Sequence, residues 1–189
     1  MIILASKSPR RVEILKEILG DIPFETIPSS FNERAIHNKD CRKLCLTEAQ
    51  GKGREVALSH PDDIVIASDT MVVYQGEQLG KPKDEEDVYR MLRLLTGHVH
   101  EVVTAYTIMK GREELTHRVC VAKVFLEKMA DAEISIYIDS GSPFDKAGAY
   151  GIQDNDFIDG KVVDGDYYTI MGLPKDDLED DLVRLGIID

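Results

Sequence analysis

Short apolar runs alternate with amphipathic stretches along most of this chain of 189 residues. Aliphatic runs predict strands at residues 2–5, 24–27 and 64–74. Apolar side chains spaced three or four residues apart predict helices at about residues 10–20, 44–59, 84–95, 130–139 and 175–185. Two longer runs, 99–109 and 115–126, flank a glycine turn and predict a β-hairpin. This alternation predicts the α/β fold class.

Composition limits the kind of partner. With 43% hydrophobic and 31% charged residues, the chain is typical of a globular protein, and we expect one domain over residues 1–189. No apolar run approaches the roughly 18 residues that cross a bilayer, so no membrane partner is expected. A net charge of −12 argues against a nucleic-acid polymer but leaves room for a small anion. Three cysteines and no secretory leader predict a cytoplasmic protein. The acidic residues 176–181 are expected to form a solvated helix face.

The first predicted helix begins with an unusual concentration of positive charge. Ser8 is placed to cap this helix, and Pro9 suits its first position because a missing N–H costs nothing there. Arg10 and Arg11 follow in the first turn, where cations are normally disfavoured by the helix dipole. A bound phosphate would explain them, since helix N-termini bind anions. The alternative is an ordinary capped helix with two solvated arginines.

A carboxylate interrupts the most apolar strand. Asp69 follows the run Ile64–Ala67, and burying a carboxylate is costly unless a cation or donor meets it. This position suits a general base or a metal ligand at the floor of a cleft; the alternative is an aspartate that caps its neighbours at a strand end. A phosphatase of the haloacid-dehalogenase type is excluded, because its second aspartate would stand where this chain has Met71.

Four further charged residues are candidates for a site. Glu33 follows two serines in a polar segment, Lys52 lies within a predicted helix, and Lys81 stands between a glycine and a proline. Lys146 lies in the loop 140–156, which is long enough to suggest function and has glycines that let the backbone approach a ligand closely. Taken one at a time, Glu33 and Lys52 are better explained as solvated surface charges, whereas Lys81 and, more so, Lys146 are the stronger candidates.

Histidines and cysteines suggest two weaker hypotheses. His37, Cys41 and Cys45 are spaced so that a helix would align them as ligands of a soft metal, but no fourth ligand accompanies them. His98 and His100 begin a predicted strand, and we expect them to be partly exposed structural residues.

Taken in order, these motifs resemble one protein family, the Maf (septum formation) family of nucleoside triphosphate pyrophosphatases. The resemblance extends from Leu4 to Pro174, and its most specific part is the run from Asp145 to Gln153. The matching positions are Ser6, Ser8-Pro9-Arg10-Arg11, Glu33, Lys52, Ser68-Asp69-Thr70, Gly80-Lys81-Pro82, 145–153 and Gly172-Leu173-Pro174.

The resemblance implies a two-lobed α/β fold with a mixed sheet and a central cleft, similar to that of inosine triphosphate pyrophosphatases. It also implies hydrolysis of a nucleoside triphosphate to the monophosphate and pyrophosphate, with Mg²⁺ or Mn²⁺ as cofactor, and a homodimer. Arg10, Thr70 and Gln153 resemble the branch that acts on dTTP and UTP. Gly53, Ser142 and Thr169 depart from the commonest family residues, which are alanine, glutamate and asparagine, and this concerns positioning rather than the reaction.

These observations assign hypothetical roles. Asp69 is the general base, and Glu33 is the first choice for holding the metal; Asp69 is an alternative metal ligand, and the sequence does not separate its two roles. The amide of Gln153 can accept from N3–H and donate to a ring carbonyl, a pairing that uracil and thymine offer and cytosine does not. The residues expected to act in catalysis are Asp69, Glu33, Lys52 and Lys81, and those expected to bind substrate are Ser8, Arg10, Arg11, Thr70, Lys146 and Gln153.

Two other functions fit the same motifs. One is a related pyrophosphatase with broader or modified-base specificity. The other is a nucleotide-binding regulator of cell division, which would bind nucleotide without turnover. A buried base favours an enzyme, because a protein that only binds nucleotide does not need one.

Overall fold

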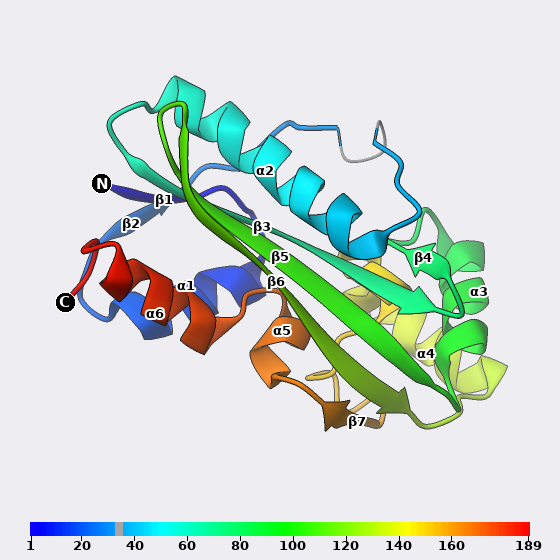
Figure 1. The fold of residues 1–189 in the computed structure, drawn as a ribbon. Coiled ribbons are helices and arrows are strands. Elements are labelled where there is room, and N and C mark those ends of the chain that lie inside the picture. Colours follow the sequence, from blue (N-terminus) through cyan, green and yellow to red (C-terminus); the bar gives the residue numbers. More distant parts are fainter. Residues whose placement is uncertain (33–35) are drawn as a thin grey trace. The chain divides into compact units, whose positions relative to one another are not determined.

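The computed structural model describes residues 1–32 and 36–189, and within them the strands form one mixed sheet of seven strands. The strand order is β2-β1-β3-β5-β6-β7, and β4 pairs with β3 (Figure 1). The predicted α/β class is confirmed. The strands are β1 (Ile2–Leu4), β2 (Phe24–Thr26), β3 (Ile64–Tyr74), β4 (Glu77–Leu79), β5 (Val99–Lys110), β6 (Glu113–Leu126) and β7 (Gly160–Asp164). The helices are α1 (Pro9–Leu19), α2 (Cys41–Ser59), α3 (Glu85–Leu95), α4 (Asp131–Asp139), α5 (Tyr167–Met171) and α6 (Lys175–Arg184), with 3₁₀ turns η2 (Ser142–Asp145) and η3 (Ala147–Ala149).

The chain divides into two compact units, and the long strands β3, β5 and β6 supply segments to both. That one domain spans residues 1–189 stays a prediction. Unit 1 comprises Met1–Asp69, Thr104–Cys120 and Met171–Asp189; unit 2 comprises Thr70–Val103 and Val121–Ile170.

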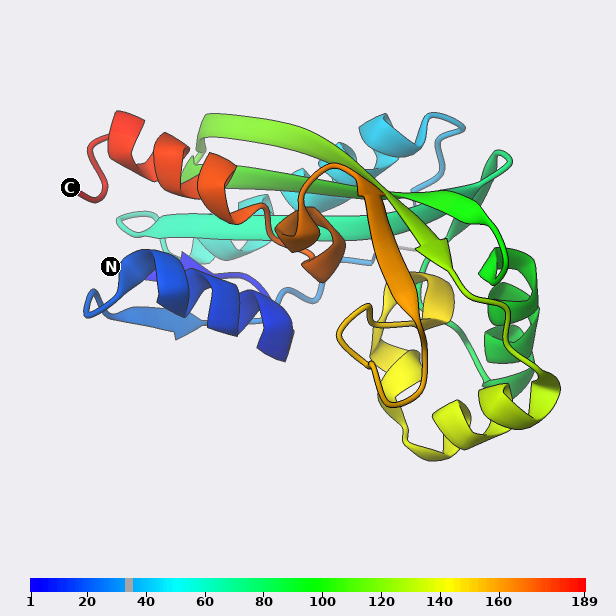
Figure 2. The same ribbon diagram turned by 90° about the horizontal axis from the view of Figure 1, so that it is seen from below.

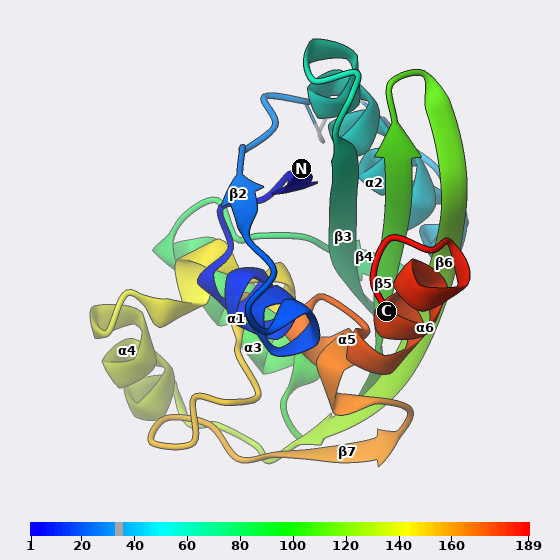
Figure 3. The same cartoon turned by 90° about the vertical axis from the view of Figure 1, so that its left-hand side faces the viewer.

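In unit 1, β1 lies between two parallel neighbours. Ile2 is in register with Phe24 of β2 on one side and with Ile64 of β3 on the other. Figure 3 shows β2 at the edge of this group of strands. Helix α2 covers one face of the unit 1 sheet, and α1 and α6 cover the other (Figure 1). Parallel strands covered on both faces account for the nearly continuous apolar sequence of β1 and β3.

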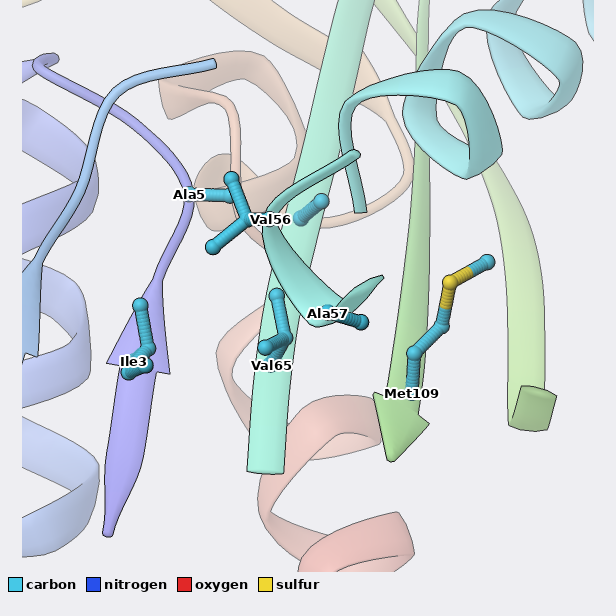
Figure 4. Close-up of a cluster of buried hydrophobic side chains, with 7 residues drawn as sticks. Ile3, Ala5, Val56, Ala57, Val65 and Met109 are labelled. Atoms are coloured by element: carbon cyan, nitrogen blue, oxygen red, sulfur yellow. The ribbon is translucent and has the colours of Figure 1, made fainter. Parts of the chain in front are cut away.

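The core beneath α2 explains where the polar residues of β3 point. Successive side chains in a strand alternate between faces, so Val65 and Ala67 share the α2 face. Continuing that alternation, Asp69 lies on the α2 face and Ser68 on the opposite one. Figure 4 shows this core, which consists of Ile3, Ala5, Val56, Ala57, Val65, Ala67 and Met109.

Unit 2 is built around α3, which contacts both α4 and η3. In Figure 2, α3 and α4 lie together with the 3₁₀ turns beside them. The carboxylate of Asp84 caps α3 by accepting from the backbone N–H of Asp87 at 2.8 Å, as the sequence predicts. Strands β3 and β4 pair antiparallel, as do β6 and β7, and the β6–β7 register shifts between Lys123 and Val124.

The structure corrects several predicted boundaries. Helix α2 begins at Cys41, three residues before the predicted start, because the Asp40 carboxylate accepts from the backbone N–H groups of Arg42 and Lys43. The predicted loop 140–156 contains η2 and η3, while β7 and α5 were not predicted at all. These elements are of five residues or fewer, too short for a clear hydrophobic period.

The solvated face predicted for residues 176–181 is wrong at one position. Asp181 is fully buried on α6. Its carboxylate accepts hydrogen bonds from the guanidinium groups of Arg118 and Arg184 and from the hydroxyl of Tyr106. Arg184 lies one turn further along α6, but Tyr106 and Arg118 lie on β5 and β6, so only the fold brings these two to Asp181. Among the described helices, none has the length and apolarity needed to span a membrane.

Candidate active site

In unit 1, the start of α1 has the predicted form. Ser8 accepts at its Oγ from the backbone N–H of Arg11 at 3.5 Å, and its own N–H donates to Ser6 Oγ at 3.1 Å. Pro9 is the first helical residue, and the first turn contains no acidic side chain. Arg10 and Arg11 are half-buried there, and with the helix N-terminus they make a site suited to an anion.

Arg11 also ties this helix end to β3. Its Nε donates to the carbonyl oxygen of Gly172 at 2.9 Å, and Ser68 Oγ donates to the same oxygen at 3.0 Å. Gly172 has a φ of +106°, a backbone conformation that favours glycine, which explains the glycine in the predicted Gly-Leu-Pro motif. The Arg11 charge is therefore held beside the residue that precedes Asp69.

Asp69 is 4% exposed and forms a buried ion pair with Lys52 of α2. The Lys52 Nζ donates to Asp69 Oδ1 at 2.9 Å. Burial alone would raise the pKa of Asp69, but the Lys52 ammonium, hydrogen bonding by Glu48 and Lys52, and the Arg11 charge together hold that pKa below its ordinary value. Asp69 is therefore ionised at neutral pH, as a base must be.

Sequence reasoning missed Glu48, which is 3% exposed on α2. It lies one turn before Lys52, and its carboxyl forms a hydrogen bond that further lowers the pKa of Asp69. The available signal was the spacing of four residues between Glu48 and Lys52, on the helix face that also buries Cys45 and Ala49. Two carboxyl groups and one ammonium thus meet at the end of the unit 1 part of β3.

One oxygen of this cluster is left over. Asp69 Oδ2 is buried and accepts no hydrogen bond from any described residue. Buried acceptors are nearly always satisfied, so an orphan one suggests a missing partner. A hard cation such as Mg²⁺ would be coordinated by this carboxylate oxygen, and a water molecule would donate a hydrogen bond to it. Glu33, the other predicted metal ligand, lies outside the described residues.

The soft-metal hypothesis finds no support in the described part of the chain. No group of three or more His, Cys, Asp and Glu side chains there is arranged to hold a metal ion. Neither Cys41 nor Cys45 is in a disulfide bond.

In unit 2, Lys146 is clamped within its own loop. Its Nζ donates to Ser142 O at 2.6 Å, to Ser142 Oγ at 2.9 Å and to Asp145 Oδ1 at 2.9 Å. An ammonium group has three N–H donors, so these contacts use all of them. The Asp145 side chain is 56% exposed, which makes it the contact most easily exchanged for a ligand.

Gly151 brings Lys146 and Gln153 together. A Cβ atom at residue 151 would lie 2.8 Å from Lys146 Cε and 2.9 Å from Gln153 Oε1. Both distances are shorter than van der Waals contact, so a Cβ at this position would push aside the lysine stem or the glutamine amide. That the glycines of this loop let the backbone approach a ligand closely stays a prediction.

The neighbouring backbone is strained and joined to a second predicted motif. Ala149 is buried with a φ of +64°, which is costly for a residue with a Cβ and typical of functional loops. The N–H of Gly148 donates to Gly80 O at 3.1 Å, so Gly80 and the exposed Lys81 lie beside this loop. Thr70, which directly follows Asp69 in β3, is half-buried.

Of the two histidines expected to be partly exposed, one is buried. His100 bonds through Nε2 to the hydroxyl of Tyr150 at 2.6 Å, and burial lowers its pKa to about 4, so it is neutral at physiological pH. His98 is exposed. His98 precedes β5, whereas His100 is buried within that strand, where Tyr150, next to Gly151, gives it a partner.

These elements carry the motifs of a known family. The sequence model of the Maf-like protein family matches residues 1–185 of this chain. This chain belongs to the Maf family. A dTTP/UTP pyrophosphatase from Carboxydothermus hydrogenoformans is 43% identical to this Maf protein, with 92% of each chain covered. Another dTTP/UTP pyrophosphatase, from Pyrococcus furiosus, is 42% identical, with 92% of this chain and 89% of the relative covered.

Among solved structures, a HAM1 protein from Coxiella burnetii has a similar fold. The TM-score is 0.51 at 13% sequence identity, and the match covers 97% of the Maf chain and 98% of the HAM1 chain. Identity this low shows the fold alone. The predicted mixed-sheet α/β fold is confirmed.

Two of the three departures from the commonest Maf residues have a structural context. A Cβ at Gly53 would lie 3.0 Å from Thr107 Cγ2 and 3.3 Å from Ala67 Cβ, so alanine would force its neighbours to shift. Ser142 accepts two hydrogen bonds from Lys146 Nζ, one at its carbonyl oxygen and one at its hydroxyl. Thr169 is buried in α5, and nothing in the structure explains why it replaces asparagine.

Proposed function

We propose that this Maf protein hydrolyses dTTP and UTP to the nucleoside monophosphate and pyrophosphate. The observation that carries the proposal is the buried Asp69, which is ionised by Lys52 at Oδ1 and keeps an unused acceptor at Oδ2. The names of the two relatives supply the substrates. A structural carboxylate would be satisfied on both oxygens, whereas one that acts on water needs an open one.

The reaction needs one water and one base. The water oxygen bonds to the α-phosphorus, the bond from that phosphorus to the bridging oxygen breaks, and pyrophosphate leaves with the electron pair. Asp69 Oδ2 orients the water and takes its proton as negative charge develops on the α-phosphate oxygens. Lys52 keeps Oδ1 occupied, so the carboxylate presents its other oxygen to the water.

The cations of unit 1 bind the phosphates. A triphosphate carries three to four negative charges, and Arg10, Arg11 and the α1 N-terminus supply positive charge and N–H donors at one helix end. Ser8 adds a hydroxyl at the same end. Because these groups are fixed before substrate binds, they stabilise the charge of the transition state without reorganising.

The orphan Asp69 Oδ2 and the carboxylate of Glu33 are the groups that would hold a divalent cation, Mg²⁺ or Mn²⁺, with Glu48 close by. Such a cation neutralises phosphate oxygens and makes the α-phosphorus easier to attack. A measurement of Mn²⁺ binding separates the role of Asp69 as general base from its role as metal ligand. If Asp69→Asn loses turnover but keeps Mn²⁺ binding, Asp69 acts as the base alone.

In unit 2, Gln153 recognises the base and Lys146 binds phosphate. The Gln153 amide pairs with N3–H and a ring carbonyl, which selects uracil and thymine over cytosine, and Thr70 adds a hydroxyl contact. Lys146 exchanges the exposed carboxylate of Asp145 for a phosphate oxygen while it keeps both Ser142 contacts. Lys81 adds a further cation from the same unit.

The remaining proposals concern partners and location. The net charge of −12 favours a small nucleotide over a nucleic-acid polymer. The three cysteines, none of which is in a disulfide bond, suit a reducing cytoplasm. A homodimer is the expected assembly. Light scattering at micromolar concentration measures the assembly directly.

The decisive experiment is pyrophosphate release with Mg²⁺ from dTTP, UTP, CTP, dATP, GTP and 7-methyl-GTP. We expect turnover of dTTP and UTP that exceeds turnover of the others, and loss of it in Asp69→Asn. The matched control is Asp181→Asn, the same change at a buried carboxylate of unit 1 that has no open oxygen. Nucleotide binding without pyrophosphate from any substrate would overturn the proposal in favour of a regulator.

A further inference from the structure

The buried hydroxyl of Tyr137 on α4 is bonded to both ends of the turn 151–154. The backbone N–H of Gly151 donates to the Tyr137 oxygen at 2.9 Å, and the hydroxyl donates to Asp154 Oδ2 at 2.6 Å. A phenol has one hydrogen to donate, so each contact fixes the direction of the other. Burial and the adjacent Asp154 carboxylate raise the pKa of Tyr137, which keeps it protonated as the donor.

Gln153 lies inside the turn that these bonds close. The Asp154 N–H donates to Gly151 O at 3.0 Å, and the Asn155 N–H donates to Gln153 O at 2.9 Å. The Gln153 amide oxygen lies 2.9 Å from the position that a Cβ of residue 151 would occupy. The direction of this amide therefore depends on where Gly151 and Asp154 are held, and a single phenol oxygen holds both.

The same carboxylate reaches Lys146 through Ser142. Asp154 Oδ2 accepts from Ser142 Oγ at 2.6 Å, and Ser142 Oγ accepts from Lys146 Nζ at 2.9 Å. The direct distance from Lys146 Nζ to Asp154 Oδ2 is 3.9 Å. Ser142, where most relatives are expected to have glutamate, thus works with a carboxylate supplied by Asp154.

The ring of Tyr137 has a separate packing role. It stacks on Phe157 with ring centroids 5.4 Å apart and planes at 20°. Phenylalanine at this position keeps that stacking and removes only the hydroxyl, so packing and positioning can be tested apart.

We propose that Tyr137 and Asp154 are specificity-determining positioning residues: they hold the turn that aims Gln153 at the pyrimidine ring, and Asp154 also anchors the Ser142–Lys146 contact. This inference rests on the proposed function. It assigns base selectivity to two residues that do not themselves touch the base.

The test compares kcat and KM for dTTP and CTP in Tyr137→Phe. Removing the hydroxyl leaves the Gly151 N–H and one Asp154 acceptor without this partner, and the turn relaxes. We expect the ratio of kcat/KM for dTTP over CTP to fall about tenfold, the equivalent of one lost hydrogen bond. The change should come mainly from KM for dTTP, with kcat within about twofold, because the Lys52–Asp69 pair is untouched.

Tyr106→Phe is the matched control. Tyr106 is also buried, and its hydroxyl donates to a buried aspartate, Asp181, but it lies in unit 1 away from the turn. It should lower the melting temperature without changing the dTTP/CTP ratio. An equal fall of the ratio in both variants would show that any loss of a buried hydroxyl loosens selectivity, and the inference would be wrong.

Asp154→Asn separates the two halves of the proposal and serves if Tyr137→Phe does not fold. An amide oxygen still accepts from Tyr137, but the charge near Lys146 is lost. We expect KM to rise for dTTP and CTP alike, with a smaller change in their ratio. Two results would contradict the assignment. One is a kcat/KM ratio for dTTP over CTP that stays at the wild-type value in Tyr137→Phe. The other is a fall of that ratio in Asp154→Asn without a rise in KM for CTP.

Different results would overturn the proposed function and the positioning role of Tyr137 and Asp154. A wild-type protein that releases no pyrophosphate from dTTP or UTP overturns the proposed function. Calorimetric Kd values for dTTP and CTP then test the turn alone, because the Tyr137 bonds predict the same loss of preference in binding. Equal Kd values for the two nucleotides in the wild type would overturn the inference as well.

Discussion

Two buried aspartates of unit 1, Asp69 and Asp181, differ in how completely they are satisfied. Both are ionised through a nearby cation that holds the pKa below its ordinary value against the effect of burial. Both oxygens of Asp181 accept hydrogen bonds, from Tyr106, Arg118 and Arg184. In Asp69, Oδ1 is held by Lys52 and Oδ2 by nothing described.

The difference separates a structural carboxylate from one that is available for chemistry. A fully satisfied buried charge rigidifies the fold, because moving any partner exposes an uncompensated group. A buried oxygen without a partner costs stability in the resting protein and is retained where a ligand or water completes it. Burial and charge pairing alone would not have told the two aspartates apart.

The largest effect is expected from Asp69→Asn. Asparagine keeps the shape but cannot take a proton, so kcat for dTTP should fall by about 10²–10⁴ while the circular dichroism spectrum and nucleotide binding are retained. Steady-state pyrophosphate release measures it. Turnover within about threefold of wild type would remove Asp69 from the role of base.

Asp181→Asn should lower stability and leave catalysis unchanged, the opposite of Asp69→Asn. Losing the charge between Arg118, Arg184 and Tyr106 should lower the free energy of unfolding by about 2–3 kcal/mol, since a buried network is broken. Urea denaturation gives this value, and kcat of the folded fraction should be unchanged. A variant as stable as wild type, or one with kcat lowered a hundredfold, would erase the contrast between the two carboxylates.

Glu48→Gln sharpens the comparison from the Asp69 side. The amide keeps a hydrogen bond to Asp69 but removes one of the two carboxyl groups. We expect kcat to fall about tenfold, corresponding to about 1.4 kcal/mol, less than for Asp69 itself. Titration with Mn²⁺ supplies the second readout, and an unchanged kcat together with unchanged Mn²⁺ affinity would make Glu48 a bystander.

The smallest effect concerns pH. Because the pKa of Asp181 is lower in the folded than in the unfolded chain, its contribution to stability is present above about pH 4, the unfolded value, and is lost as pH falls further. The stability difference between wild type and Asp181→Asn should therefore be constant from pH 7 to pH 5 and shrink below about pH 4. Urea midpoints at several pH values test this; a gap that widens in acid would contradict it.

Much of the fold followed from local patterns. The Ser8 and Asp84 caps, the β3 boundaries and the hairpin of β5 and β6 were predicted because they depend on side chains within a few positions of one another. The elements between residues 140 and 171 were missed, since each is too short for its own period and is fixed by contacts such as Gly148 N–H to Gly80 O.

The candidate site divides in the same way. The sequence marked Asp69 because a carboxylate in an apolar strand is costly without a role, and Lys146 because it lies in a glycine-rich loop. Lys52 and Gln153 gained their roles from the family resemblance. It did not mark Glu48, Tyr137 or Asp154. A buried glutamate, a tyrosine in an amphipathic helix and an aspartate in a loop are each ordinary residues until their partners are known.

The sequence by itself determined which side chains share a strand face or a helix end, and through its motifs the family. Only the tertiary structure decided which buried carboxylate is left with an open oxygen. Asp69 meets Lys52 across 17 positions, and Asp181 meets Arg118 and Tyr106 across 63 and 75. Hydrogen-bond satisfaction depends on atoms a few ångströms apart in space, and no local pattern specifies which distant residues will be there.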